Sequence, residues 1–267
     1  LMVDLDSRAQ IGALAVHGYN DGVTPTPASD AATKWSAAAR NCAQVGKPLW
    51  MTETSGYSTD WNGAFQFAQM MHAALRYGKI AVWVHWYGTN FLDANANKNK
   101  KYYVAKQVYR YVRPGAVMYD VTDVSTDGVL VTAFVHQQDR TMTVIAMNAN
   151  TGNTQLTLTG TGLPSQYQVY RTSSGQNCAS QGTSGNTLTL PGNSITTLYA
   201  TNYDMPTTAA VPPAQATPSA RGATATARLY DLRGRAIGTS ARVRGLTPGT
   251  YCQVRDAASS MKVMLTR

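Results

Sequence analysis

The feature of this sequence that most constrains its fold is a change of apolar periodicity near residue 115. Before that point, three short apolar runs each lead through a polar loop into a pattern with helical spacing. After it, apolar residues alternate in short runs rich in Thr, Val and Tyr, separated by turn signals such as Asp127-Gly128. The first pattern is typical of parallel strands with crossover helices, and the second of antiparallel sheets. The sequence therefore predicts two architectures in one chain.

Residues 1–115 are predicted to hold three strand–loop–helix units. The expected strands are Ile11–Val16, Pro48–Glu53 and Ile80–Trp86, and the expected helices cover Trp35–Val45, Asn62–Tyr77 (with Gly78 as its C′ residue) and Tyr102–Val112. A complete (β/α)8 barrel needs about 250 residues, so three units cannot close one. We therefore expect residues 1–115 to be the last strands and helices of an incomplete barrel, in a chain truncated at its N-terminus.

The remaining residues are predicted to form β structure in two pieces. Residues 116–203 are expected to form a β-sandwich with one solvent-exposed face. Residues 204–226 are rich in Pro, Ala and Thr and are predicted to be an extended linker. Residues 227–267 are predicted to form a small β module, with strands at 227–230, 241–244, 249–255 and 261–266. The fold class expected for the whole chain is α/β plus all-β.

Charge is concentrated in the last fifty residues. From Pro218 onward there are eight Arg and one Lys against two Asp, so this stretch carries +7 of the formal net charge of +9. The body is nearly neutral, and we expect neither nucleic-acid binding nor, since no apolar run approaches ~18 residues, a membrane span. Charged residues make up 14% of the chain, against roughly 25% in typical soluble domains. This composition favours a secreted or cell-surface protein that faces carbohydrate.

Three cysteines, Cys42, Cys178 and Cys252, lie far apart, without the CxxC spacing of zinc or thioredoxin-like sites. An odd number leaves at least one thiol without an intramolecular partner. Cys42 is predicted to be a core residue on a helix. No metal or organic cofactor is predicted.

The chain contains a single glutamate, Glu53, among fourteen acidic residues. It ends the second expected strand, and the other two strands end in polar and aromatic clusters. Side chains at the carboxyl ends of barrel strands converge on one pocket, so we predict a candidate site made of Glu53 with His17, Tyr19, His85, Trp86 and Tyr87. A carboxylate, a phenol that orients it and an indole face for a pyranose ring suit glycoside chemistry.

Each of these residues has a structural alternative. Glu53 could be a solvated loop acid, Trp86 a core residue, and His17 and His85 buried histidines with structural roles. The other candidates are expected to be structural: Trp50 and Trp83 in the core, His72 and His136 in packed positions, and Asp21, Asp60 and Asp93 in turns.

Four segments in order carry a family resemblance: His17-Gly18-Tyr19, Trp50–Glu53, Val82–Trp86 and Arg110–Gly115. Together they resemble the C-terminal part of glycoside hydrolase family 30, a retaining group of the (β/α)8 clan, over roughly residues 10–203. The resemblance implies that Glu53, at the end of the seventh strand, is the nucleophile. It implies that His17 and Tyr19 follow the sixth strand and Trp86 the eighth. The family's acid/base glutamate ends the fourth strand, which this chain does not include.

Two further features bear on ligands. Glucuronoxylanases of the family bind a glucuronate branch with an Arg after the eighth strand, but here residues 87–93 contain no Arg, and Lys98, Lys100 or Lys101 would be poorer clamps.

The segments Leu229–Arg235 and Gly245–Tyr251 resemble the basic, sorting-type tail domains of some secreted bacterial hydrolases. An ordinary small β module is the alternative for this tail.

We therefore expect a retaining glycoside hydrolase fragment that cleaves a plant β-glycan, most plausibly xylan, with Glu53 as nucleophile. Alone it is expected to be nearly inactive, because the general acid and most barrel strands are missing. It is also expected to be a monomer. The tail would engage the cell surface or secretion machinery. The alternative is a non-catalytic carbohydrate-binding or cell-surface attachment protein.

Overall fold

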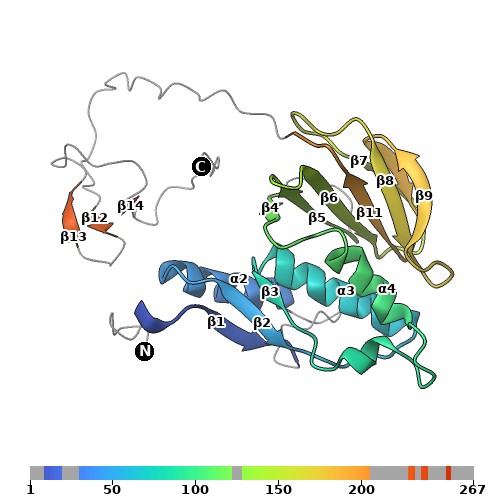
Figure 1. The fold of residues 1–267 in the computed structure, drawn as a ribbon, viewed down its shortest axis with the longest axis horizontal. Coiled ribbons are helices and arrows are strands. Elements are labelled where there is room, and N and C mark those ends of the chain that lie inside the picture. Colours follow the sequence, from blue (N-terminus) through green and yellow to red (C-terminus); the bar gives the residue numbers. More distant parts are fainter. Residues whose placement is uncertain are drawn as a thin grey trace. The chain divides into compact units, whose positions relative to one another are not determined.

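The computed structural model describes residues 9–19, 30–121, 128–204, 228–231, 236–239 and 251–253. One compact unit spans Ala13–Ala209. It contains the two predicted architectures in the predicted order (Figure 1). Among the described residues, no helix has the length and apolar character needed to cross a membrane.

The first part of this unit is a parallel three-stranded sheet with its connecting helices. Strands β1 (Leu14–His17), β2 (Leu49–Glu53) and β3 (Val82–Trp83) pair in that order. The connections contain α2 (Ala31–Gln44), α3 (Trp61–Arg76), the 3-10 turn η1 (Gly88–Phe91) and α4 (Lys100–Tyr109). All three predicted units are present. The third strand is much shorter than Ile80–Trp86, because only Val82 and Trp83 find paired partners on β2.

Local chemistry explains where α3 begins and ends. Asp60 is its N-cap, and the carboxylate accepts a hydrogen bond of 2.9 Å from the Gly63 amide. The helix ends at Arg76, with Tyr77 as its C-cap and Gly78 just beyond. The left-handed φ belongs to Lys79, at 49°. A glycine is needed at position 78 because there is no room for a side chain: a Cβ there would lie 2.6 Å from the Trp35 ring.

The second part is a β-sandwich of eight strands. Its six-stranded antiparallel sheet runs in the order β4-β5-β6-β11-β8-β9, and β10 pairs with β7 in a two-stranded sheet. The bounds are β4 (Val117–Tyr119), β5 (Val129–His136), β6 (Thr141–Asn148), β7 (Thr154–Thr157), β8 (Tyr167–Thr172), β9 (Ala179–Ser184), β10 (Thr187–Leu190) and β11 (Ser194–Ala200).

The expectation of one solvent-exposed sandwich face is wrong for the central strands. Every residue of β6 is buried, and β5 is almost as fully buried. One face of the sheet packs on α3 and α4 in a common core that includes Phe67, Val104, Phe134 and Ile145 (Figure 1). The other face packs on β7 and β10 in a second core. The helices of the first part therefore cover the face that the sequence pattern left open.

A third core lies between the parallel sheet and α2. Trp35, Leu49 and Met51 are almost fully buried there. Trp83 packs against this core and the first one, as predicted, and its ring meets Phe67 edge-on at 6.0 Å. Trp50 is 39% exposed, so its prediction as a core residue is wrong. The reason lies in the register of β2, described below.

Outside this unit, three short strands form a sheet in the order β13-β12-β14: β12 (Arg228–Asp231), β13 (Ala236–Thr239) and β14 (Tyr251–Gln253). Two of them overlap predicted strands, and β13 was not predicted. The expected strands at 241–244 and 261–266, the linker beyond residue 204, and Asp21 lie outside the described residues.

Candidate active site

The predicted site forms where the parallel strands β1 and β2 end, and an irregularity in their pairing sets its geometry. Val16 pairs with Met51, but His17 pairs with Glu53, so Thr52 is an extra residue on β2. Strict alternation would have put Glu53 on the same face as Leu49 and Met51, against the helices. The extra residue turns it to the face of His17 instead. Trp50 lies before the extra residue Thr52. Strict alternation counted back from Glu53 therefore assigned Trp50 to the face opposite Glu53, in the core, whereas its side chain is exposed.

Glu53 is held through both carboxylate oxygens. The Tyr19 hydroxyl donates a hydrogen bond of 2.5 Å to Oε1, and His17 Nε2 lies 3.5 Å from Oε2. The Glu53 side chain is 21% exposed and that of His17 57% exposed. Its hydrogen bond to Glu53, above all, raises the pKa of the Tyr19 phenol, so the hydroxyl stays protonated as a donor. The carboxylate is thus oriented while one side stays open.

A set of main-chain hydrogen bonds fixes the strand ends around Glu53. The Gly18 amide donates to the Glu53 carbonyl at 2.8 Å, and the Trp86 amide donates to the Thr54 carbonyl at 2.7 Å. The Thr54 hydroxyl, buried at 1% exposure, donates to the Gly18 carbonyl at 2.5 Å. Gly18 also allows close packing, since a Cβ would lie 2.6 Å from the Met70 methyl carbon. Thr54 was not predicted, because a Thr after a strand is an ordinary loop residue.

Lys101 fixes the loop that follows Glu53. Its side chain is 1% exposed, and its ammonium donates to the carbonyls of Gly56 at 3.0 Å and Tyr57 at 3.1 Å. Gly56 adopts its φ of 94° without cost, but Tyr57 has a φ of 57°, so the backbone at Tyr57 is strained and needs support. Burial lowers the pKa of Lys101. The sequence suggested Lys101 only as a possible clamp for a sugar acid, and the structure places it under this loop.

The two neighbouring lysines are also engaged elsewhere. Lys100 donates to the Ser173 carbonyl at 2.9 Å and to Asn177 Oδ1 at 2.6 Å, so it joins α4 to the sandwich. Lys98 lies over the Tyr102 ring, 4.9 Å from its centroid.

The residues after β3 divide between the site and the core. Trp86 and Tyr87 are 50% and 55% exposed, and their rings meet edge-on at 5.6 Å. Tyr87 lies close enough to Tyr19 to influence its titration electrostatically. His85 instead lies between Phe67 and Phe91, with ring centroids 5.4 and 4.7 Å away. Burial lowers the pKa of His85 to about 4. Glu53, His17 and Tyr19 are therefore in direct contact, Tyr87 and Trp86 flank them, and His85 packs in the apolar layer.

Apart from Trp50, which is exposed, and Asp21, which lies outside the described residues, the residues that were expected to be structural are so. His72 is 5% exposed on α3, and Nε2 of His136, also buried, donates to the Pro114 carbonyl at 2.8 Å while its Nδ1 accepts from the Asp139 amide. Asp93 accepts backbone hydrogen bonds from Asn95 and Asn97 in a turn. Cys42 is buried on α2, and neither it nor Cys178 forms a disulfide; the Cys252 side chain lies outside the described residues.

Comparisons with known proteins agree with this fold. Residues 115–198 match the model of the glycosyl hydrolase family 30 beta sandwich domain. A GH30 endoxylanase from Clostridium papyrosolvens C71 is similar in structure, with a TM-score of 0.61 and 24% identity, over 75% of this chain and 51% of that one. A family 30 subfamily 8 xylanase from Clostridium acetobutylicum gives a TM-score of 0.61 at 19% identity, with the same coverage. A comparison with curated proteins gave no match.

These comparisons support part of the predicted resemblance. The sandwich matches the family 30 domain, and the similarity in fold extends beyond it, into the helices and parallel strands. The chain spans about half the length of these two solved structures, 51% of each. The resemblance of the tail to sorting-type domains stays a prediction.

Proposed function

We propose that this chain is the C-terminal part of a secreted retaining glycoside hydrolase that cleaves a plant β-glycan, with xylan as the preferred substrate. The observation that carries the proposal is that Tyr19 and His17 each contact one carboxylate oxygen of Glu53 at the ends of parallel strands. The match of the following domain to family 30 supports it further, as does the similarity in fold to two xylanases.

In the proposed reaction Glu53 is the nucleophile. Its carboxylate attacks the anomeric carbon, and a glycosyl ester forms as the glycosidic C–O bond breaks. A second carboxylic acid protonates the leaving oxygen and later takes a proton from the water that displaces Glu53. Such pairs stand about 5 to 5.5 Å apart in retaining enzymes. Because Glu53 is the only glutamate here, the second group would come from strands that precede this chain in a longer protein.

The residues around Glu53 have matching roles in this proposal. Tyr19 holds Oε1, and Oε2, whose contact with His17 is longer at 3.5 Å, is the oxygen that would meet the sugar. Trp86 and Tyr87 present exposed aromatic surface beside it, and such surface suits the apolar face of a pyranose. The loop at residues 87–93 contains no Arg. Together with the engagement of the lysines elsewhere, this favours a neutral xylan segment over recognition of a glucuronate branch.

A mechanism-based label tests the nucleophile. A longer protein that includes the upstream strands should hydrolyse xylan, and a 2-fluoro-xylobioside with a good leaving group should add its glycosyl mass to the Glu53 peptide. The Glu53→Gln variant should lose turnover and labelling but keep binding to xylan. Labelling of another residue, or full xylanase activity of the 267-residue chain alone, would overturn the proposal.

The alternative is a non-catalytic glycan-binding or attachment protein, with the basic tail holding acidic polymers at the cell surface. The single glutamate favours this alternative, since a reaction that needs two glutamates cannot be completed within the chain. Under it, the longer protein binds xylan but shows neither turnover nor labelling.

A further inference from the structure

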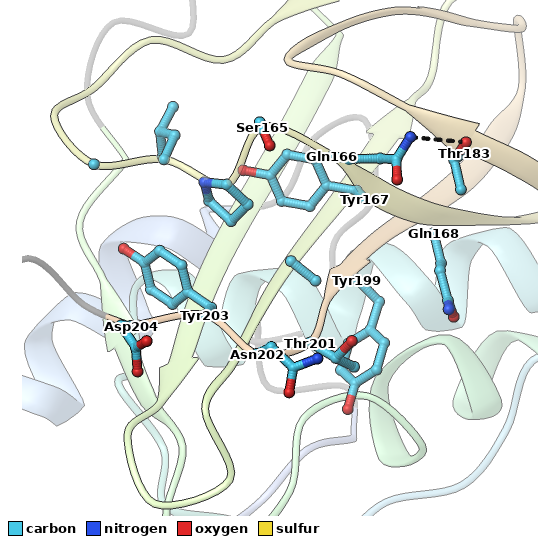
Figure 2. Close-up of a pocket in the computed structure, with 14 residues that line it drawn as sticks. Ser165, Gln166, Tyr167, Gln168, Thr183, Tyr199, Thr201, Asn202, Tyr203 and Asp204 are labelled. Atoms are coloured by element: carbon cyan, nitrogen blue, oxygen red, sulfur yellow. Dashed lines mark hydrogen bonds between the residues drawn. The ribbon is translucent and has the colours of Figure 1, made fainter.

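A groove on the sandwich, separate in its residues from the Glu53 site, has a volume of about 450 Å³. Three segments line it: the loop that leads into β8, Thr183 on β9, and the end of β11 with the residues that follow. Figure 2 shows Tyr199 and Tyr203 on either side of the turn at Thr201 and Asn202. The volume lies within the range of small-molecule sites, about 300 to 1,000 Å³.

The chemistry of the lining is neutral and rich in hydrogen-bonding groups. Its exposed polar side chains are three amides and three hydroxyls, contributed by Gln166, Gln168, Asn202, Ser165, Thr183 and Thr201. The one carboxylate, Asp204, already accepts hydrogen bonds of 2.7 and 2.6 Å from Arg140. Amides and hydroxyls beside partly buried tyrosine rings match a ligand with many hydroxyl groups and apolar ring faces. They offer little to a phosphate, a metal ion or a charged peptide.

The lining is also held in place before any ligand arrives. The Tyr199 ring packs on Tyr111 at 5.2 Å, and Tyr111 stacks on Tyr170 at 4.8 Å. Gln166 donates to the Thr183 hydroxyl at 3.3 Å across the groove rim (Figure 2). The Tyr203 amide donates to the Arg140 carbonyl at 2.8 Å. Side chains that are already held by hydrogen bonds or ring packing lose less conformational freedom on binding than unconstrained side chains.

We propose that this groove binds a segment of a neutral β-glycan chain, as a second carbohydrate site of the molecule. The preference for a neutral polyhydroxylated ligand follows from the lining, and the choice of a plant β-glycan rests on the proposed function. The groove would retain the polysaccharide on the sandwich while a different stretch of chain reaches the strand ends that carry Glu53.

Calorimetric titration of the 267-residue chain with xylohexaose and with cellohexaose tests this site. We expect binding of at least one of them. The groove variant Gln166→Ala/Gln168→Ala/Thr183→Ala, which changes only exposed side chains, should bind about tenfold more weakly because it loses three hydrogen-bonding groups. The matched control Gln155→Ala/Thr157→Ala/Thr187→Ala, exposed on β7 and β10, should bind like the parent. Thermal melts check that both variants fold.

A further variant, Trp86→Ala, separates the groove from the candidate active site. Binding that survives in Trp86→Ala and falls in the groove variant supports the inference. Binding that is lost only in Trp86→Ala, equal binding by parent and groove variant, or no binding of either oligosaccharide overturns it. Turnover by the longer protein is measured separately. Absent turnover with intact groove binding would overturn the proposed function and leave this inference standing.

Discussion

At the scale of single residues, the hydrogen bond from Tyr19 to Glu53 is the contact most closely tied to the proposed chemistry. A hydrogen bond to a charged group contributes about 1.5 to 3 kcal/mol. Its loss in Tyr19→Phe should therefore lower kcat about 10- to 100-fold in the longer, active protein, with a smaller change in KM. Steady-state kinetics on xylan measure both. Tyr77→Phe removes a hydroxyl on a different element and should leave kcat unchanged; an unchanged kcat in Tyr19→Phe as well would contradict the role given to Tyr19.

Two histidines, His72 buried and His85 half-buried, should make folding sensitive to acid. Burial, above all, lowers the pKa of His72 and of His85 from 6.5 to about 4. Both stay neutral in the folded chain at pH 5, where an unfolded chain binds protons, so stability is full above pH 6.5 and falls as the pH drops toward 4. Urea titrations at pH 7 and pH 5 should show this loss, and it should be smaller in His72→Phe. An equal loss of stability between pH 7 and pH 5 in the parent and in His72→Phe would contradict this role of His72.

Residue-level prediction from the sequence worked where a residue type is rare or its position is marked. Glu53 is the only glutamate and follows an apolar strand, and Tyr19 follows the neighbouring strand, so their meeting could be expected. Thr54 and Lys101 could not be predicted, because their roles depend on partners distant in the sequence, such as the Gly18 carbonyl. The face of Trp50 was missed because an inserted residue on β2 is invisible to a count of alternation.

At the scale of elements, α4 supports the loop after β2 through a single side chain. Lys101→Met keeps the apolar stem but leaves the Gly56 and Tyr57 carbonyls without this donor. Hydrogen bonds to a charged group contribute about 1.5 to 3 kcal/mol, so the variant should be less stable in urea by about that amount. Amides of the loop from Ser55 to Asp60 should also exchange faster.

The control for this prediction is Lys98→Met, because Lys98 is exposed and its ammonium lies over the Tyr102 ring. It should retain both the stability and the exchange rates of the parent. Equal exchange rates in Lys101→Met and the parent would show that the turn at Gly56 and Tyr57 keeps its conformation without Lys101.

The positions of helices and strands were predicted more reliably than the packing of their faces against other elements. The helix α3 was expected at 62–77 and lies at Trp61–Arg76, because its apolar residues keep the helical period and Gly78 follows its end in the sequence. The predicted exposed face of the sandwich is buried under α3 and α4. Periodicity reports which faces of one element are apolar, and the strands β5 and β6 are apolar on both. Which helices would cover them is a tertiary property that the pattern does not specify.

At the scale of the whole unit, the parallel sheet has one face on its helices and one face open in the described residues. Leu49 and Met51 are buried on the helix side, whereas Trp50, Val84 and Trp86 are exposed. An apolar exposed sheet face of this kind marks a surface that another layer covers. In the proposed longer protein, that layer is the rest of a (β/α)8 barrel, whose interior is filled by side chains from its strands.

Chemical modification of tryptophan tests this arrangement. In the 267-residue chain, N-bromosuccinimide should oxidise Trp50, which is 39% exposed, and should spare Trp35, which is fully buried. In the longer protein, closure of the barrel should protect Trp50 while Trp86, at the strand ends, stays reactive unless xylohexaose is bound. Peptide mass spectrometry reports each site separately. Equal oxidation of Trp50 in both proteins would mean that no further strands cover this sheet, and the barrel expected from the three strand–helix units would then be wrong.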